Sequence, residues 1–229
     1  MNNQIVDRPL REDGPVHAAS EAHVALSLVL DVSGSMSGTP ILHLNDAVNQ
    51  MIREMKADDR LSEIVDLSIF IFGTRDRQVI HQGFRAIADC ETIDLQATDV
   101  NTYVADALNR AMDVTRNRCS IYDKGGGSYK PWIVLITDGE FHDDAVTLAS
   151  VANKLKERES NGKLNFFGLG VEGYKREQVE QLTNNPGHVI DVKTANFVEF
   201  FKWVGKSLKT VSTKAVGESV ELPPLVFKV

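Results

Sequence analysis

The sequence predicts an α/β fold in which a mainly parallel β-sheet is covered by helices on both faces. Two observations lead to this prediction. Strand-like and helix-like segments alternate along the chain from about residue 23, and such alternation is typical of a parallel sheet with crossover helices. The segments 24–30 and 132–136 are nearly continuous apolar runs, as expected for strands that are buried on both faces.

The first half of the chain contains one strand, one helix and a pair of strands. The strand at 24–30 precedes a helix that we expect to begin at Thr39-Pro40, because proline is tolerated at the first helical position. The apolar face of this helix consists of Ile41, Leu44, Val48, Met51, Ile52 and Met55. Segments 66–72 and 78–84 have strand character and a short connection, which predicts an antiparallel hairpin at an edge of the sheet.

The second half continues the alternation to the end of the last helix. We expect a helix near Thr102, a strand at 132–136, and a helix marked by Val146, Ala149, Ala152 and Leu155. The strands at 164–169 and 189–192 are separated by a short helix at 177–182. The last helix opens at Asn196, and Glu199 three residues later predicts a capping box.

The two ends of the chain stand outside this pattern. We expect residues 1–20 to be a flexible or loosely docked extension, residues 21–213 to form the domain, and residues 214–229 to be an extended tail. The tail contains Pro223-Pro224, and consecutive prolines cannot join a helix or a central strand.

Composition limits the class of protein and its partners. The 229 residues suffice for one large α/β domain, and 25 basic against 32 acidic residues give a net charge of −7. This charge argues against a general nucleic-acid binder, and no apolar run is long enough for a membrane span. The polar start has no secretory h-region, so we expect a cytoplasmic protein in which Cys90 and Cys119 are reduced.

Chemistry-bearing residues cluster where two predicted strands end. Asp31, Ser33 and Ser35 follow the first strand, and Asp138 follows the strand at 132–136. Ligands of open α/β sheets bind beyond the carboxyl ends of the strands. With Thr102, these side chains form an all-oxygen set that suits a hard cation, Mg²⁺ first, with Mn²⁺ or Ca²⁺ as alternatives. Neutral hydroxyls leave the ion's charge partly unbalanced, so the ion would gain from a carboxylate of another protein.

This pattern resembles the metal-ion-dependent adhesion site of von Willebrand factor A (VWA) domains. The resemblance rests on Asp31-x-Ser33-x-Ser35, a later threonine at a helix start and Asp138-Gly139; Thr102 is preferred to Thr98 because Ala105, Ala107 and Leu108 follow it in the family's spacing. It implies a Rossmann-like sheet with an antiparallel edge strand, and a non-enzymatic module that binds a protein partner. It further implies direct metal contacts from both serines, direct or water-mediated contacts from both aspartates, and a threonine that responds to the partner.

A narrower resemblance is to the bacterial TerY-like subgroup of tellurium-resistance and stress operons. It rests on the segments 121–139, 199–203 and 220–224. It implies a cytoplasmic binding module that works beside other stress proteins, including a kinase and a phosphatase. Residues 1–20 are longer than the lead-in of that subgroup.

Several residues next to the predicted site are candidates for a partner-binding rim. These are Met36, Tyr103, Glu140 and Phe141. We expect Asp143 and Asp144 to cap and charge the first turn of the following helix, and His142 to be a solvent-facing turn residue.

Three alternatives compete with the metal-dependent binding module. The motif at 31–35 could be an ordinary strand-to-helix turn in a structural domain with an empty site. A Mg²⁺-dependent phosphohydrolase of the haloacid dehalogenase type also has Asp after its first strand, but it needs a carboxylate where Ser33 stands. Gly168, Gly170 and Gly173 with Asp191 form a literal dinucleotide fingerprint, yet late in the chain, and we interpret the glycines as strand-end geometry.

Overall fold

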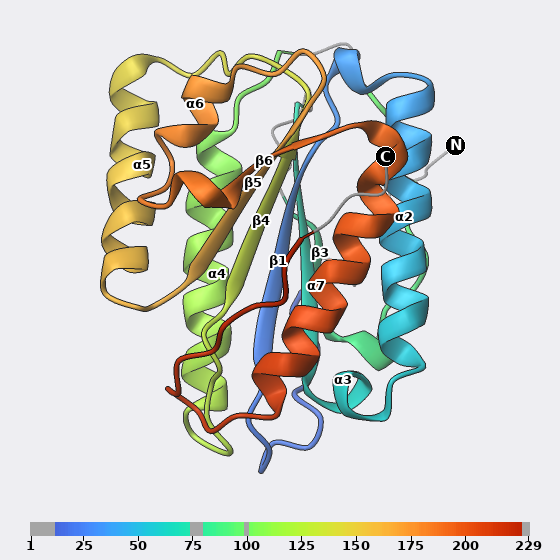
Figure 1. Ribbon diagram of the computed structural model, residues 1–229, viewed down its shortest axis with the longest axis vertical. Coiled ribbons are helices and arrows are strands. Elements are labelled where there is room, and N and C mark those ends of the chain that lie inside the picture. Colours follow the sequence, from blue (N-terminus) through green and yellow to red (C-terminus); the bar gives the residue numbers. More distant parts are fainter. Residues whose placement is uncertain (1–11, 74–79, 99–100, 226–229) are drawn as a thin grey trace.

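A six-stranded sheet forms the middle layer of the protein (Figure 1). The computed structural model describes residues 12–73, 80–98 and 101–225. The strands, in the order β3-β2-β1-β4-β5-β6, are β1 Val24–Asp31, β2 Val65–Phe72, β3 Ile80–Ala86, β4 Trp132–Thr137, β5 Asn165–Val171 and β6 Val189–Val192. All neighbouring pairs are parallel except β2 and β3, which are antiparallel. The predicted fold class and its antiparallel edge strand are therefore confirmed; residues 78 and 79 of the expected strand lie outside the described residues.

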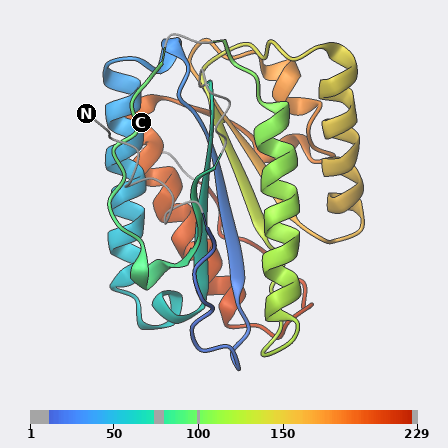
Figure 2. The same cartoon turned by 180° about the vertical axis from the view of Figure 1, so that it is seen from behind.

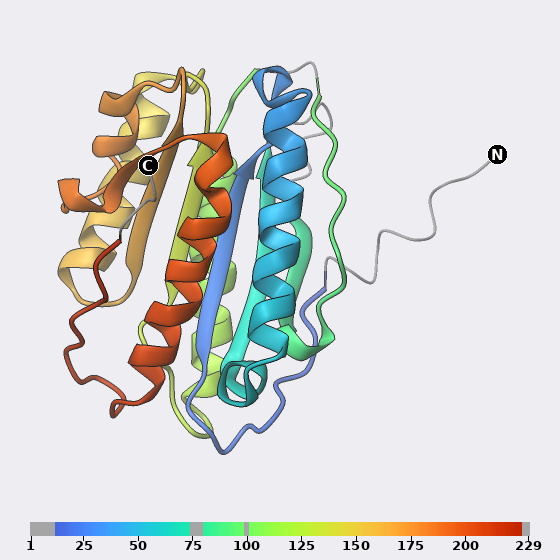
Figure 3. The same cartoon turned by 45° about the vertical axis from the view of Figure 1, so that its right-hand side comes forward.

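Helices cover both faces of the sheet, as Figures 1 and 2 show from opposite sides. One face is covered by α2 Thr39–Lys56, α3 Asp59–Ile64 and α7 Phe197–Ser212, and the other by α4 Ala105–Tyr122, α5 Ala145–Ser160 and α6 Arg176–Glu180. Two buried apolar clusters, one on each face, hold the layers together. In Figure 3, α2 and α7 run side by side over the same face. No helix in the described part of the chain is long and apolar enough to span a membrane.

Two helix starts differ from the sequence prediction. Helix α4 begins at Ala105, so Thr102 lies in the preceding loop and does not open the helix. At α7 the predicted capping box is wrong, because a 3₁₀ turn, Thr194–Asn196, leads directly into the helix. The backbone of Asn196 is therefore not extended (φ −103°, ψ 6°), and its side chain makes no capping hydrogen bond.

The described part of the N-terminal extension, residues 12–20, is called the lead-in below. From Asp13 onward it is docked on β3 and α4, more firmly than the sequence suggested. The amide of Phe84 in β3 donates to Asp13 Oδ1 (2.8 Å), and the Gly14 amide donates to the Phe84 carbonyl (2.7 Å). The guanidinium of Arg118 in α4 donates to the carbonyls of Gly14 (2.6 Å) and Pro15 (3.0 Å). These bonds cover the outer edge of β3 at Phe84. Residues 1–11 lie outside the described part.

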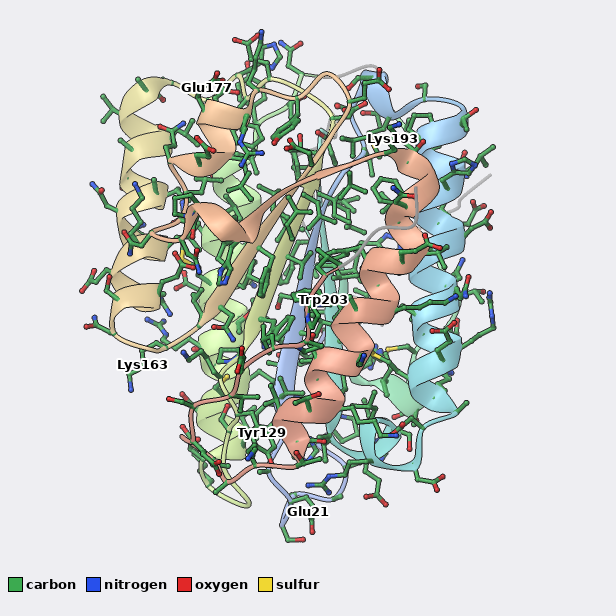
Figure 4. All side chains as sticks on the ribbon, viewed as in Figure 1. Glu21, Tyr129, Lys163, Glu177, Lys193 and Trp203 are labelled. Carbon is green, nitrogen blue, oxygen red and sulfur yellow. The ribbon has the colours of Figure 1, made fainter. Side chains whose placement is uncertain are left out.

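The segment after α7 runs back over the α7 face without regular secondary structure. The indole of Trp203 in α7, labelled in Figure 4, donates to the Pro223 carbonyl (2.7 Å). Leu222 and Leu225 pack against the apolar cluster on that face. Residues 222–225 thus dock the tail on the domain, whereas residues 213–219 are exposed.

Cys90 and Cys119 are free thiols, as expected.

Candidate metal centre

Asp31 and Asp138 lie at the same edge of the sheet. Asp31 is the last residue of β1, and Asp138 follows β4 directly. The two strands are parallel neighbours in register at Leu30 and Ile136, so their carboxyl ends meet at the upper end of the sheet in Figure 1. The two aspartates therefore stand at the same edge of the sheet, as a shared binding site requires.

Hydrogen bonds fix the orientation of the Asp31 carboxylate, which is 0% exposed. Its Oδ1 accepts from the backbone amide of Ser33 (2.9 Å), and its Oδ2 accepts from the hydroxyl of Thr137 (2.7 Å). Thr137 is also buried and accepts from the Gly139 amide (3.3 Å). Sequence reasoning missed Thr137; its place directly before Asp138 was the only signal.

Ser35 links the loop after β1 to the loop after β4. Its hydroxyl donates to Asp138 Oδ1 (2.6 Å) and lies 3.1 Å from the hydroxyl of Ser33. Ser35 therefore connects two segments that are 103 residues apart, and the Ser33 hydroxyl lies next to it.

Gly139 shows how closely the remaining side chains gather. A Cβ atom at this glycine would lie 3.2 Å from Thr102 Oγ1, 3.8 Å from Ser35 Oγ and 3.9 Å from Asp31 Oδ2. The structure thus brings all five predicted ligands to one place. Thr98, the rejected alternative, instead donates its hydroxyl to the Gly73 carbonyl.

The loop that carries Thr102 is held by the residues after Asp138. The amide of His142 donates to the Thr102 carbonyl (2.8 Å), and the Thr102 amide donates to His142 Nδ1 (3.3 Å). Asp143 accepts from the amides of Val104 (2.8 Å) and Ala105 (3.2 Å). Asp143 therefore caps the start of α4, which corrects the expectation that it caps the next helix. His142 is exposed, as predicted.

Asp144 alone performs the expected capping of α5. It accepts from the amides of Val146 (3.1 Å) and Thr147 (2.9 Å). The adjacent residues Asp143 and Asp144 thus cap two different helices. The local sequence could not show which of the two acids caps which helix.

Burial dominates the electrostatics of the site. It raises the pKa of Asp31 to about 6, against the hydrogen bonds from Ser33 and Thr137 and with the help of the nearby Asp138 charge. Burial also raises the pKa of Asp138, which the bond from Ser35 opposes. Neither carboxylate has an ion pair with a cation in the described residues. A bound cation would favour the charged forms of both.

The donor set fits a hard divalent cation. In the described part of the chain no three His, Cys, Asp or Glu side chains gather to hold a metal, so this site would combine two carboxylates with three neutral hydroxyls. Mg²⁺ accepts such oxygen ligands and keeps water in the remaining positions. The residues present therefore suit a hard divalent cation such as Mg²⁺, whose remaining coordination positions would be filled by water or by an oxygen of a partner.

The prediction that four residues form an exposed rim is wrong for two of them. Met36 is 0% exposed and Phe141 is 4% exposed, because both side chains pack into the apolar clusters. Met36 ends a 3₁₀ turn, Gly34–Met36, that directs it inward. Tyr103 is 46% exposed and Glu140 is exposed as well, so these two remain candidates for a rim.

The glycines of the apparent dinucleotide fingerprint have a packing role. Gly168 and Gly170 lie inside β5, so they are neither in a βα turn nor at the strand end. A Cβ at Gly168 would lie 2.3 Å from the side chain of Val179, and one at Gly170 would lie 2.0 Å from the ring of Tyr174. These glycines make room for the segment that crosses the strand, and they do not surround a phosphate site.

The fold and the convergence of oxygen ligands at its strand ends define a Rossmann-like domain with a candidate cation site. Comparison with known families identifies the family: the von Willebrand factor type A domain model matches residues 26–203. The chain therefore belongs to the VWA family, a metal-dependent adhesion and protein-interaction fold whose members are generally not enzymes.

Solved structures with the same fold are distant in sequence. The pilus adhesin SpaC from Lactobacillus rhamnosus GG is 13% identical (TM-score 0.64), the match covering 87% of this chain and 31% of the adhesin. The vWF domain of the pilus tip protein Mfa5 from Porphyromonas gingivalis is 10% identical (TM-score 0.62), with 87% and 99% covered. Proximal thread matrix protein 1 from the mussel byssus, solved with a zinc-occupied MIDAS motif, is 17% identical (TM-score 0.53), with 81% and 48% covered.

This chain thus spans less than half of the mussel protein and of SpaC. No curated protein sequence matches it significantly.

Proposed function

We propose that this domain binds a protein partner through a divalent cation held by Asp31, Ser33, Ser35, Thr102 and Asp138. The cation is Mg²⁺ by preference, and a carboxylate of the partner completes its coordination. The domain acts as a binding module and performs no chemical reaction of its own.

One observation carries this proposal: two buried carboxylates, which pair with no cationic side chain of the described residues, converge with three hydroxyls, and the five side chains come from three separate segments. Asp31 is 0% exposed, and within the described part of the chain it accepts hydrogen bonds only from neutral donors. A Cβ at Gly139 would lie within 3.9 Å of Thr102 Oγ1, Ser35 Oγ and Asp31 Oδ2. The three hydroxyls add no negative charge, and aspartates that contact a divalent ion through water neutralise it only in part. An anionic oxygen from outside is then a favourable further ligand.

The narrower resemblance bears on the biological setting of the domain and on the kind of partner it binds. We propose a cytoplasmic role in a bacterial tellurium-resistance or stress system, with a kinase and a phosphatase among its partners. Support comes from the segments 121–139, 199–203 and 220–224, which resemble the TerY-like subgroup.

Thermal unfolding tests the metal site. The midpoint is measured in EDTA and then in millimolar Mg²⁺, Mn²⁺ or Ca²⁺, for wild type, Asp31→Ala and the control Asp46→Ala, which removes an exposed carboxylate of α2. A ligand that binds only the folded state raises its stability, by about 2.7 kcal/mol at a hundredfold excess over Kd. We expect the midpoint to rise with metal in wild type and Asp46→Ala, and to stay constant in Asp31→Ala.

Equal rises in wild type and Asp31→Ala would place the ion elsewhere and contradict the proposal. The absence of any rise in wild type would contradict it as well. Circular dichroism of each variant in EDTA checks that the comparison is made between folded proteins.

A further inference from the structure

The tail after α7 borders a large groove at the end of the sheet opposite the candidate metal centre (Figure 1). The groove has a volume of about 1270 Å³. On the domain it is lined by the starts of β4 and β5, the second half of α4 and the last turns of α5, and on the tail by residues 215–220 and Leu222. The tail therefore forms one wall of this space and does not fill it.

Residues 222–225, called the docked segment below, have the sequence Leu-Pro-Pro-Leu. A residue before proline favours an extended backbone, and proline fixes its own φ near about −65°, so this sequence favours a polyproline II helix with three residues per turn. The exposure of the side chains has the same period. Glu221 and Pro224 are exposed, whereas Leu222 and Leu225 are partly buried and pack against the apolar cluster of the α7 face.

The docked segment meets an aromatic surface next to the groove. The indole N–H of Trp203 donates to the Pro223 carbonyl (2.7 Å). The ring centroid of Trp203 lies 5.7 Å from that of Trp132 and 5.3 Å from that of Phe167. Polyproline II segments are recognised on aromatic-lined surfaces, and a proline offers its carbonyl to such a donor because it has no N–H of its own. The tail thus binds its domain as a proline-rich ligand would.

The tail leaves one polar group of this site unsatisfied. Trp132 is 0% exposed, and its indole N–H has no hydrogen-bond partner in the described part of the chain. A buried donor without an acceptor is unfavourable. Trp132 also lines the groove, so a longer ligand has space to enter there and to offer a carbonyl to this second indole.

The attachment of the docked segment is slight. Within the described residues, one hydrogen bond joins it to the domain. The connection at 213–219 is exposed, and its start is held by the Tyr129 hydroxyl, which donates to the carbonyls of Ser212 (3.4 Å) and Lys214 (3.1 Å). The docked segment can therefore leave the aromatic surface while α7 keeps its place.

We propose that Trp203, Trp132 and the adjoining groove form a binding site for a proline-rich segment of a partner protein, which the docked segment occupies as an intramolecular ligand. The partner segment carries prolines between two apolar residues three positions apart, as Leu222 and Leu225 are, and continues into the groove. The short connection gives the tail a high effective concentration. A partner binds by displacing it.

Peptide binding to a chain with a released tail tests this proposal. Leu222→Asp places a charge where an apolar side chain packs, so we expect the docked segment to leave while the domain stays folded. The probe is a fluorescent peptide with the wild-type sequence of residues 217–225, followed by anisotropy in EDTA. We expect Leu222→Asp to bind it at least about tenfold more tightly than wild type, in which the tail competes.

Two further variants and one further peptide serve as controls. Val216→Asp introduces the same charge at an exposed apolar residue of the connection (47% exposed), and it should bind the peptide like wild type. A peptide with both prolines replaced by alanine should bind Leu222→Asp at least about tenfold more weakly, because it is not preorganised. Trp203→Phe, added to Leu222→Asp, removes the indole donor and should weaken binding about 2–10-fold. Circular dichroism checks that each variant is folded.

The indole resonances locate the bound peptide. The chain has two tryptophans, so an NMR spectrum of the ¹⁵N-labelled Leu222→Asp chain resolves two indole N–H signals, and Trp203→Phe identifies which is which. Both signals should shift when the peptide is added. Signals that stay in place while the peptide binds would put the peptide on another surface and overturn the proposal.

Other results would also overturn it. These are no binding to Leu222→Asp, equal binding of the proline and alanine peptides, or wild type binding as tightly as Leu222→Asp. A wild-type chain that sediments as a dimer, with Leu222→Asp as a monomer, would make the tail of a second copy the occupant in place of a partner. Because every measurement is made in EDTA, none of these results bears on the metal-dependent function.

Discussion

Two carboxylates of this protein are equally buried but are treated in opposite ways. Asp31 in β1 and Asp66 in β2 are both 0% exposed. Asp66 Oδ2 accepts from the guanidinium of Arg118 (2.6 and 2.8 Å) and from the hydroxyl of Tyr122 (2.6 Å). In the described part of the chain, Asp31 accepts from the Ser33 amide and the Thr137 hydroxyl, and no cationic side chain pairs with it. One buried charge is balanced by the chain itself and the other is not.

The difference indicates what each carboxylate is for. Arg118 also binds the carbonyls of Gly14 and Pro15, so the Asp66 pair connects β2, α4 and the lead-in into one structure. Asp31 lies at the strand end where the hydroxyls converge, and burial there raises its pKa to about 6. A buried charge that destabilises the folded protein when no cation is bound is expected at a functional site.

The largest effect should come from breaking the balanced pair. Arg118→Met leaves the Asp66 carboxylate buried without a cation, and we expect a loss of about 3–5 kcal/mol in the free energy of unfolding. Urea denaturation measures it. The control Arg116→Met, at an exposed position on the same helix, should change stability by less than about 1 kcal/mol. Equal losses in the two variants would show that the buried pair is not special.

The unbalanced carboxylate should respond in the opposite direction. In EDTA near neutral pH, Asp31→Asn removes the cost of a buried charge and keeps a polar side chain of similar shape. We expect a gain of about 1–3 kcal/mol in the free energy of unfolding, since one pKa unit corresponds to about 1.4 kcal/mol. Urea denaturation of Asp31→Asn and of the exposed control Asp46→Asn makes the comparison. A loss of stability in Asp31→Asn would show that the charged Asp31 side chain does not destabilise the folded protein.

The same gain should depend on pH with a defined sign. The pKa of Asp31 in the folded protein, about 6, lies above its ordinary value of 3.8, so the folded state binds this proton more tightly than the unfolded state. The resulting stability is fully present below the ordinary value and is lost as the pH rises through about 6. The advantage of Asp31→Asn over wild type in EDTA should therefore be largest near neutral pH and shrink toward about pH 4. A constant difference would contradict this assignment.

The smallest effect should come from the hydrogen bond that orients Asp31. Thr137→Val keeps the shape but removes the donor, and we expect a loss of about 1 kcal/mol in stability together with a Mg²⁺ affinity lowered by about 10–100-fold. Calorimetric titration with Mg²⁺ measures the affinity. The control Thr115→Val also removes a buried hydroxyl, bonded to Ser27 at 2.7 Å, and should lose stability without losing affinity. Equal affinities in the two variants would exclude a positioning role for Thr137.

Much of the fold could be predicted because its signals are local. The apolar runs of β1 and β4, the Thr39-Pro40 start of α2 and the short connection after β2 are each contained in a few consecutive residues. They depend on periodicity, backbone geometry and chain reach, which a neighbouring segment does not change. The same holds for Asp31 and Asp138, which stand at the ends of recognisable strands, because parallel neighbours place their carboxyl ends at the same edge. Thr102, in contrast, was chosen by its resemblance to the spacing of a known family.

The sequence by itself therefore determined the order of the strands and of the helices other than α3, and the two aspartates at one edge of the sheet. Only the tertiary structure decided which polar group meets which partner. It turned Met36 and Phe141 inward, gave Asp143 to α4 instead of α5, and paired Asp66 with an arginine 52 residues away. The physical reason is that burial and side-chain hydrogen bonding depend on segments far apart in the chain. Helix and strand patterns, in contrast, depend on residues that are close together in the chain.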